Sequence, residues 1–152
     1  LLLCDCRCGL GGFTQACKLF KKHVTAFCAF DPDSVACLHH SRNHLGQPFP
    51  LCSDLFDPVL FLTLAKAHIL AITLPASLRH SHDSDPNKGI LIGLLLSAIV
   101  LLKLCRPQLA IITCTQSFAL DHQVNNTIRE YCKETNTSGI IIGNDLVLKE
   151  KE

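Results

Sequence analysis

The stretch GILIGLLLSAIVLLKL, residues 89–104, is the feature from which we derive the predicted fold. Up to position 102 it carries no charged residue and no proline, and Lys88 and Lys103 border it. A helix rises about 1.5 Å per residue, so a membrane span needs about 20 apolar residues. Residues 89–105 therefore predict either a short membrane-embedded helix or a buried core helix, and we favour the membrane.

Three small residues recur every fourth position within this stretch: Gly89, Gly93 and Ser97. On a helix they share one face, and small residues at this spacing allow two helices in a membrane to approach closely. We predict a helix-packing face here, through which the chain forms a homo-oligomer. The alternative is that Gly89 belongs to a loop and Gly93 to an ordinary protein core.

A second apolar stretch, VLFLTLAKAHILAITLPASL, covers residues 59–78 and is broken by Lys66, His68 and Pro75. A polar segment at 79–88 connects it to the first stretch, which is the pattern of a helical hairpin. Near the other end, Asn144 lies between the apolar runs 140–142 and 146–148, which predicts a short β-hairpin. The predicted fold class is a mainly α, small helical protein with an apolar helical hairpin and this C-terminal β-hairpin.

Three regions follow from this pattern. Residues 1–50 form a Cys/His-rich amphipathic region, with one helix predicted over 13–30 and another between an Asp33 or Ser34 cap and Gly46. Residues 51–120 contain the apolar helical hairpin. Residues 121–152 form a polar region with a helix over 121–135.

Composition bears on partners and location. Of the 152 residues, 48% are hydrophobic and 18% are charged, against about 25% charged in a typical domain. The net charge of +1 gives no field that would attract nucleic acid, so no nucleic-acid partner is expected. We predict membrane lipid as the partner, and a membrane of the secretory pathway or an organelle as the location.

The sharpest metal candidate is the set Cys37, His40 and His44. Offsets of three and four residues place all three on one helix face, and thiolate and imidazole are zinc ligands. The alternative function is therefore a soluble Cys/His zinc-binding module. Otherwise no cofactor is expected.

Three positions match modification patterns. Cys105 ends the apolar stretch, where a thiol beside a membrane is a candidate for acylation. Asn125 and Asn136 begin Asn-x-Thr/Ser triplets, which predict N-glycosylation.

Catalytic motifs are not recognised. Gly9, Gly11 and Gly12 do not complete a dinucleotide-binding fingerprint, because their spacing differs and no strand is predicted before them. There is no Gly-x-Ser-x-Gly elbow and no Walker loop. We therefore predict a small membrane-associated structural or interaction protein without a catalytic site.

A last alternative concerns the origin of the chain. It starts at Leu1 and contains neither Met nor Trp, while Cys and His are frequent. These features also fit a fragment, or a translated frame with no evolved function, because local signals for folding are uneven.

Overall fold

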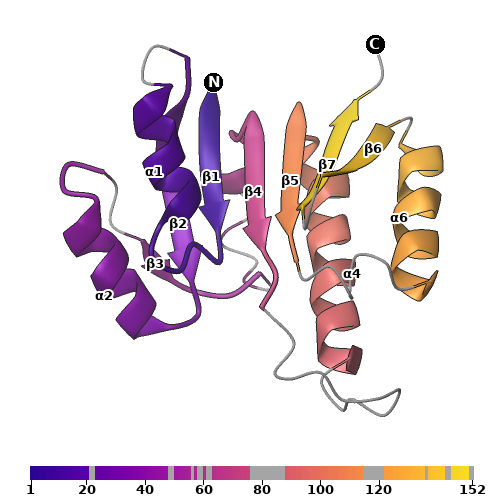
Figure 1. The fold of residues 1–152 in the computed structure, drawn as a ribbon, viewed down its shortest axis with the longest axis horizontal. Helices are drawn as coiled ribbons and strands as arrows, with labels where there is room; N and C mark the ends of the chain where they lie inside the picture. The colour runs from indigo at the N-terminus through magenta and orange to yellow at the C-terminus, as the bar shows by residue number, and fades with distance from the viewer. Residues whose placement is uncertain are drawn as a thin grey trace.

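The computed structural model describes residues 1–20, 23–47, 50–55, 57, 60, 63–75, 88–114, 122–135, 137–142 and 145–150. Its centre is a seven-stranded sheet in the order β3-β2-β1-β4-β5-β7-β6 (Figure 1). The strands are β1 Leu2–Cys6, β2 Thr25–Asp31, β3 Leu51–Cys52, β4 Ile69–Thr73, β5 Leu109–Thr113, β6 Thr137–Ile142 and β7 Asp145–Glu150. The first five pair in parallel, and β7 pairs antiparallel with both β5 and β6.

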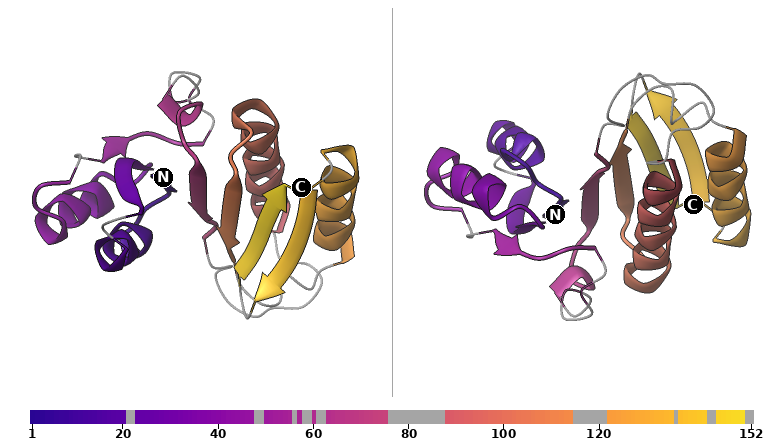
Figure 2. Two further views of the ribbon diagram at one scale, coloured as in Figure 1. Left: turned by 90° about the horizontal axis from the view of Figure 1, so that it is seen from above. Right: turned by 90° about the horizontal axis from the view of Figure 1, so that it is seen from below.

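Helices cover both faces of the sheet. They are α1 Gly12–Leu19, α2 Ser34–Asn43, α4 Lys88–Cys105 and α6 His122–Glu134. Figure 2 shows α1 and α2 on one face, and α4 and α6 on the other. This is the layered architecture of doubly wound α/β proteins, in which each crossover helix buries an apolar face against the sheet.

The core is divided by the sheet into two clusters. Successive side chains of a strand point to opposite faces, and β1 follows this rule. Leu3 lies in the cluster under α1, whereas Cys4 and Cys6 lie in the larger cluster under α4 and α6. Because β1 is buried on both faces, its sequence LLCDC is nearly continuous in apolar residues and does not alternate.

Helix α4 contains the apolar stretch 89–104 and packs on the sheet with one side, while Ile90, Leu96, Val100 and Leu104 on its other side are exposed. It buries one face in the larger cluster, through Leu91, Leu94, Leu95, Ala98, Ile99, Leu101 and Leu102. Among the described residues, the structure has no helix with the length and apolar character that crossing a membrane requires. The predictions of a transmembrane helix and of a membrane location are therefore wrong.

The second apolar stretch is not a helix along its length. Residues 69–73 form β4, which pairs with β1 and β5, so the predicted helical hairpin and the mainly α fold class are wrong. Residues 69–73 form a strand because the segment contains β-branched residues and is buried on both faces of the sheet. A central parallel strand and a buried helix give the same continuous apolar pattern.

Other elements differ in how well they were predicted. The helix expected over 13–30 ends at Leu19, and β2 begins at Thr25. Helix α2 has the predicted Asp33 cap, whose side chain accepts a 2.8 Å hydrogen bond from Val35 N, and α6 lies within the predicted 121–135. The β6–β7 pair coincides with the predicted β-hairpin, but it belongs to the large sheet.

Candidate functional site

The topology marks one edge of the sheet as the place for a ligand. From β1 the chain moves outward to β2 and β3, then crosses to the other side of β1 and continues through β4 and β5. In open α/β sheets, ligands bind outside the carboxyl ends of the strands where the order reverses in this way. The loop between β1 and α1 and the residues after β2 lie at this edge (Figure 1).

A glycine-rich loop, residues 8–12, follows β1 and is fixed by an acidic residue. Gly9 and Gly11 have positive φ angles of 51° and 89°, which glycine adopts without strain. Asp31, the last residue of β2, accepts a 2.9 Å hydrogen bond from Gly9 N at Oδ2 and another from Asp33 N at Oδ1. The carboxylate thereby joins the ends of β1 and β2.

The loop is open on one side and closely packed on the other. A Cβ added at Gly9 or Gly12 would meet no atom within 4 Å. A Cβ at Gly11 would lie 2.2 Å from Nε2 of His44. Space for a ligand therefore exists beside Gly9 and Gly12, whereas Gly11 seats the loop on the histidines of α2.

A buried chain of hydrogen bonds supports this loop. Asp5 in β1 accepts from Thr14 N at 3.0 Å and from the Thr14 hydroxyl at 2.9 Å, both at Oδ2. Since that hydroxyl donates its proton to Asp5, it accepts from His40 Nε2, 3.1 Å away. His44 Nε2 donates to the carbonyl of Leu10 in the loop at 2.9 Å. The network connects β1, α1 and α2 under the glycine loop.

Burial shifts the protonation of this network. Desolvation raises the pKa of Asp5 from 3.8 to about 6, although the two hydrogen bonds from Thr14 oppose the shift. Desolvation and the neighbouring His44 ring lower the pKa of His40. Asp5 Oδ1 and the Nδ1 atoms of both histidines are buried and have no hydrogen-bond partner. Burial thus disfavours the charged forms of Asp5 and His40, and their hydrogen bonds hold the glycine loop in place.

Cysteines near the site are protonated thiols. Cys8 is in the loop itself and is 6% exposed, and burial raises its pKa far above the ordinary value of a thiol. Burial also raises the pKa of Cys6 at the end of β1. Since the thiolate is the nucleophile, these two side chains are poorly suited to covalent catalysis.

The predicted zinc ligands do not converge. His40 and His44 lie together, with ring centroids 4.7 Å apart, but their Nε2 atoms bond to Thr14 and Leu10. The thiol of Cys37 points to the carbonyls of Asp31 and Leu51. In the part of the chain that the structure describes, no group of three or more His, Cys, Asp or Glu could hold a metal ion.

The other predicted positions that the structure describes lie on α4 and α6, on the face of the sheet opposite α1 and α2 (Figure 2). Gly93 and Ser97 are half-buried and Gly89 is exposed, all on α4, and a Cβ at either glycine would meet nothing within 4 Å. Cys105 is half-buried at the end of α4, and Asn125 is half-buried in α6. Asn136 lies outside the described residues. Acylation, glycosylation and helix packing stay predictions.

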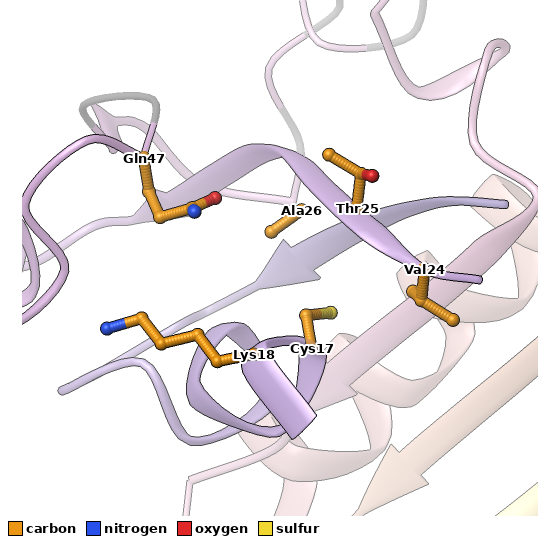
Figure 3. Close-up of a pocket in the computed structure, with 6 residues that line it drawn as sticks. All are labelled: Cys17, Lys18, Val24, Thr25, Ala26 and Gln47. Atoms are coloured by element: carbon orange, nitrogen blue, oxygen red, sulfur yellow. The ribbon is translucent and has the colours of Figure 1, made fainter. Parts of the chain in front are cut away.

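A cavity of about 220 Å³ lies at the opposite edge of the sheet (Figure 3). Cys17 and Lys18 at the end of α1 face the start of β2 across it, and Gln47 completes the lining. The amino ends of parallel strands are not where such sheets hold their ligands, so this cavity is separate from the candidate site.

No family model and no curated protein matches the chain. Solved structures do match its fold. The S. pombe Dnmt2 methyltransferase superposes over 99% of this chain with a TM-score of 0.73 at 14% identity. An E. coli prophage protein described as a DNA modification methyltransferase covers 97% with a TM-score of 0.70 at 11% identity. A SAM-dependent methyltransferase of Leishmania major covers 97% with a TM-score of 0.51 at 12% identity.

The chain therefore has the fold of these methyltransferases. It spans 49%, 45% and 62% of their respective lengths, so it corresponds to about half of the first two proteins. The prediction of a membrane-associated structural protein is wrong, because the two apolar stretches form β4 and α4 of an α/β fold that is shared with methyltransferases. The exclusion of nucleic-acid partners is wrong as well, since it depended on net charge alone and this fold is shared with a protein described as modifying DNA.

The sequence analysis missed Gly9, Gly11 and Asp31 as site residues. The available signal was an apolar run followed by glycines, with an acidic residue about 20 positions further on. The glycines were not taken as a fingerprint because their spacing differs and because no strand was recognised in LLLCDC before them. Cysteine and aspartate there interrupt the usual β-branched composition of a strand.

Proposed function

We propose that this chain binds S-adenosylmethionine at the carboxyl edge of β1 and β2, as the cofactor-binding part of a methyltransferase. The observation that carries the proposal is the 2.9 Å hydrogen bond that Gly9 N in the glycine loop donates to Asp31 Oδ2. S-adenosylmethionine supplies an electrophilic methyl group, and the protein residues argued here bind and orient its adenosine.

The position of Asp31 suits a ribose. A carboxylate at the end of the second strand accepts hydrogen bonds from ribose hydroxyls in nucleotide-binding α/β folds. Each carboxylate oxygen can accept two hydrogen bonds, and Asp31 uses one at each oxygen for Gly9 N and Asp33 N. One acceptor position at each oxygen is therefore left for the ligand.

The glycine loop suits the close approach of such a ligand. Gly12, the first residue of α1, is exposed and has no side chain, so a ligand can approach the backbone at the start of this helix. A helix N-terminus favours a negative group, such as the carboxylate of the methionine moiety.

The methyl acceptor that we assign is nucleic acid. Support comes from the fold shared with the E. coli protein described as a DNA modification methyltransferase. The test is transfer of a labelled methyl group from S-adenosylmethionine to DNA or to RNA. A folded chain that binds the cofactor yet labels neither polymer would contradict the acceptor and leave cofactor binding standing.

Cofactor binding is tested first by thermal unfolding. A ligand that binds only the folded state at 100 times its Kd stabilises by about 2.7 kcal/mol. We expect S-adenosylmethionine and S-adenosylhomocysteine to raise the unfolding temperature, whereas the same concentration of NAD should not. Equal shifts with all three ligands, or none, would contradict the proposal.

A variant with a side chain in the open space above the glycine loop tests whether the ligand binds there. Gly12→Leu places a side chain in the open space above the loop, at a residue whose φ is not positive, so the fold should persist. We expect this variant to lose most of the stabilisation by S-adenosylhomocysteine. Gly93→Ala is the control, since α4 lies on the other face of the sheet from α1 and α2 and the variant should respond to the ligand as the unsubstituted protein does.

A further inference from the structure

One ion pair crosses the edge of the sheet that the proposed ligand uses. Arg7 directly follows β1, and Asp54 follows β3. Strand β2 lies between these two strands, and it ends at Asp31. The Arg7 Nη1 atom is 3.3 Å from Asp54 Oδ1, so the arginine side chain spans the carboxyl end of β2.

The backbone of Arg7 is in an unusual conformation. Its φ angle is 55°, in the left-handed region that side chains other than glycine rarely adopt. Such conformations persist where surrounding contacts hold them, and they are frequent at ligand sites and switches. Here Cys8 N, the next amide, is held by a 2.9 Å hydrogen bond to Phe30 O at the end of β2. The backbone thus directs the Arg7 side chain toward β2 and β3.

Asp54 is positioned independently of Arg7. Its Oδ1 atom also accepts a 2.7 Å hydrogen bond from Leu55 N. If the guanidinium moved away, the carboxylate would keep its orientation and become free to accept from a ligand. The Asp54 side chain is 42% exposed and the Arg7 side chain 19%, and ion pairs this accessible to water contribute little to stability. The contact can therefore open at small cost.

We propose that the Arg7–Asp54 ion pair is a latch, which covers the adenosine position in the free protein and must open before an adenosine ligand can bind. The inference depends on the proposed function, since it concerns the same site. In the closed state Arg7 competes with the ligand for Asp54 and for the space above Asp31.

The test is the affinity of variants for three probes that share adenosine, of which only S-adenosylmethionine has a net charge. Arg7→Gln keeps the length of the side chain and removes its charge, and Arg7→Gly also removes the positive-φ strain. Isothermal titration with adenosine, S-adenosylhomocysteine and S-adenosylmethionine should show both variants binding each probe about two- to five-fold more tightly, the range for one weak ion pair. Arg42→Gln, an exposed change on α2, is the control and should leave all three affinities unchanged.

Salt gives a second readout. Because salt screens an accessible ion pair, raising potassium chloride should tighten binding of uncharged adenosine to the unsubstituted protein. The same salt should have no such effect on Arg7→Gln, which has no latch to open.

Each other outcome overturns the latch in a recognisable way. Unchanged affinity means that the ion pair does not restrict the site, and weaker binding means that Arg7 contacts the ligand directly. A gain for S-adenosylmethionine alone, the probe with net positive charge, means that only the charge of Arg7 matters. If the unsubstituted protein and all variants are folded by circular dichroism and bind no probe, the proposed function fails and the latch with it.

Discussion

Gly11 lies where the loop after β1 passes over His40 and His44. Its φ of 89° is a backbone conformation that residues with a side chain rarely adopt. An added Cβ would also lie 2.2 Å from His44 Nε2. That ring is held by Leu10 O and cannot easily move aside. Since left-handed backbone costs about 1–2 kcal/mol and the contact adds to it, Gly11→Ala should lower the free energy of unfolding by about 2 kcal/mol or more. Urea denaturation measures the change.

The neighbouring glycines separate the two causes. Gly9 has a positive φ but open space, so Gly9→Ala should lose only about 1 kcal/mol. Gly12 has neither constraint, and Gly12→Ala should stay within about 0.5 kcal/mol of the unsubstituted protein. Equal losses at Gly11 and Gly9 would mean that the histidines do not support the loop.

Asp5 makes stability depend on pH. Burial raises its folded pKa from 3.8 to about 6, so between these values the folded state holds a proton that the unfolded state has released. The free energy of unfolding should therefore fall as pH rises from 3.8 to about 6, by up to about 3 kcal/mol at 1.36 kcal/mol per pKa unit. Above that range the loss is constant.

Asp5→Asn removes this titration while an oxygen is kept for Thr14. The measurement is the difference in unfolding free energy between the variant and the unsubstituted protein from pH 3.5 to 7. The difference isolates Asp5 from His40, whose lowered pKa makes stability fall as pH drops below 6.5. We expect the variant to gain relative stability as pH rises, and a flat difference would show that the pKa of Asp5 is the same in the folded and unfolded states.

At the scale of elements, the sequence predicted that α4 is a helix but not what surrounds it. Its apolar pattern predicted a helix at 89–105, and the helix is Lys88–Cys105. The pattern did not reveal the environment, because a sheet removes water from Leu95 or Leu102 as lipid would. The partners in the sheet come from residues distant in sequence, such as Cys6 and Ile112, and no local signal identifies them.

The strands explain why the predicted fold was helical while the observed fold is α/β. Buried parallel strands lack alternation, and β1 and β4 are short apolar runs that resemble helix fragments. The local signals of α2, the Asp33 cap and the Gly46 end, need no distant partner, and that helix was predicted correctly. The glycines of the loop could be read from the sequence, but they predict a ligand site only when a strand, here β1, precedes them.

Gly93 offers a direct test of α4 as a helix on a folded domain. It lies inside the helix, and an added Cβ would meet nothing within 4 Å. Alanine restricts the unfolded chain and favours the helix, so Gly93→Ala should raise the free energy of unfolding by about 0.5–1 kcal/mol. Thermal or urea unfolding measures it. A loss of stability would indicate that another chain packs closely on this face, and sedimentation at several concentrations would then show a change of oligomeric state.

At the scale of the whole molecule, the strand order predicts which amides are protected. β1 and β4 each have hydrogen-bonded neighbours on both sides, whereas β3 and β6 are the edges of the sheet. In native-state hydrogen exchange, we expect β1 and β4 amides to exchange only by global unfolding, with one common free energy. Amides of β3 and β6 should exchange sooner through local opening. If β1 and β4 exchange as fast as the edges, the chain lacks a cooperative core, as expected for a translated frame with no evolved function.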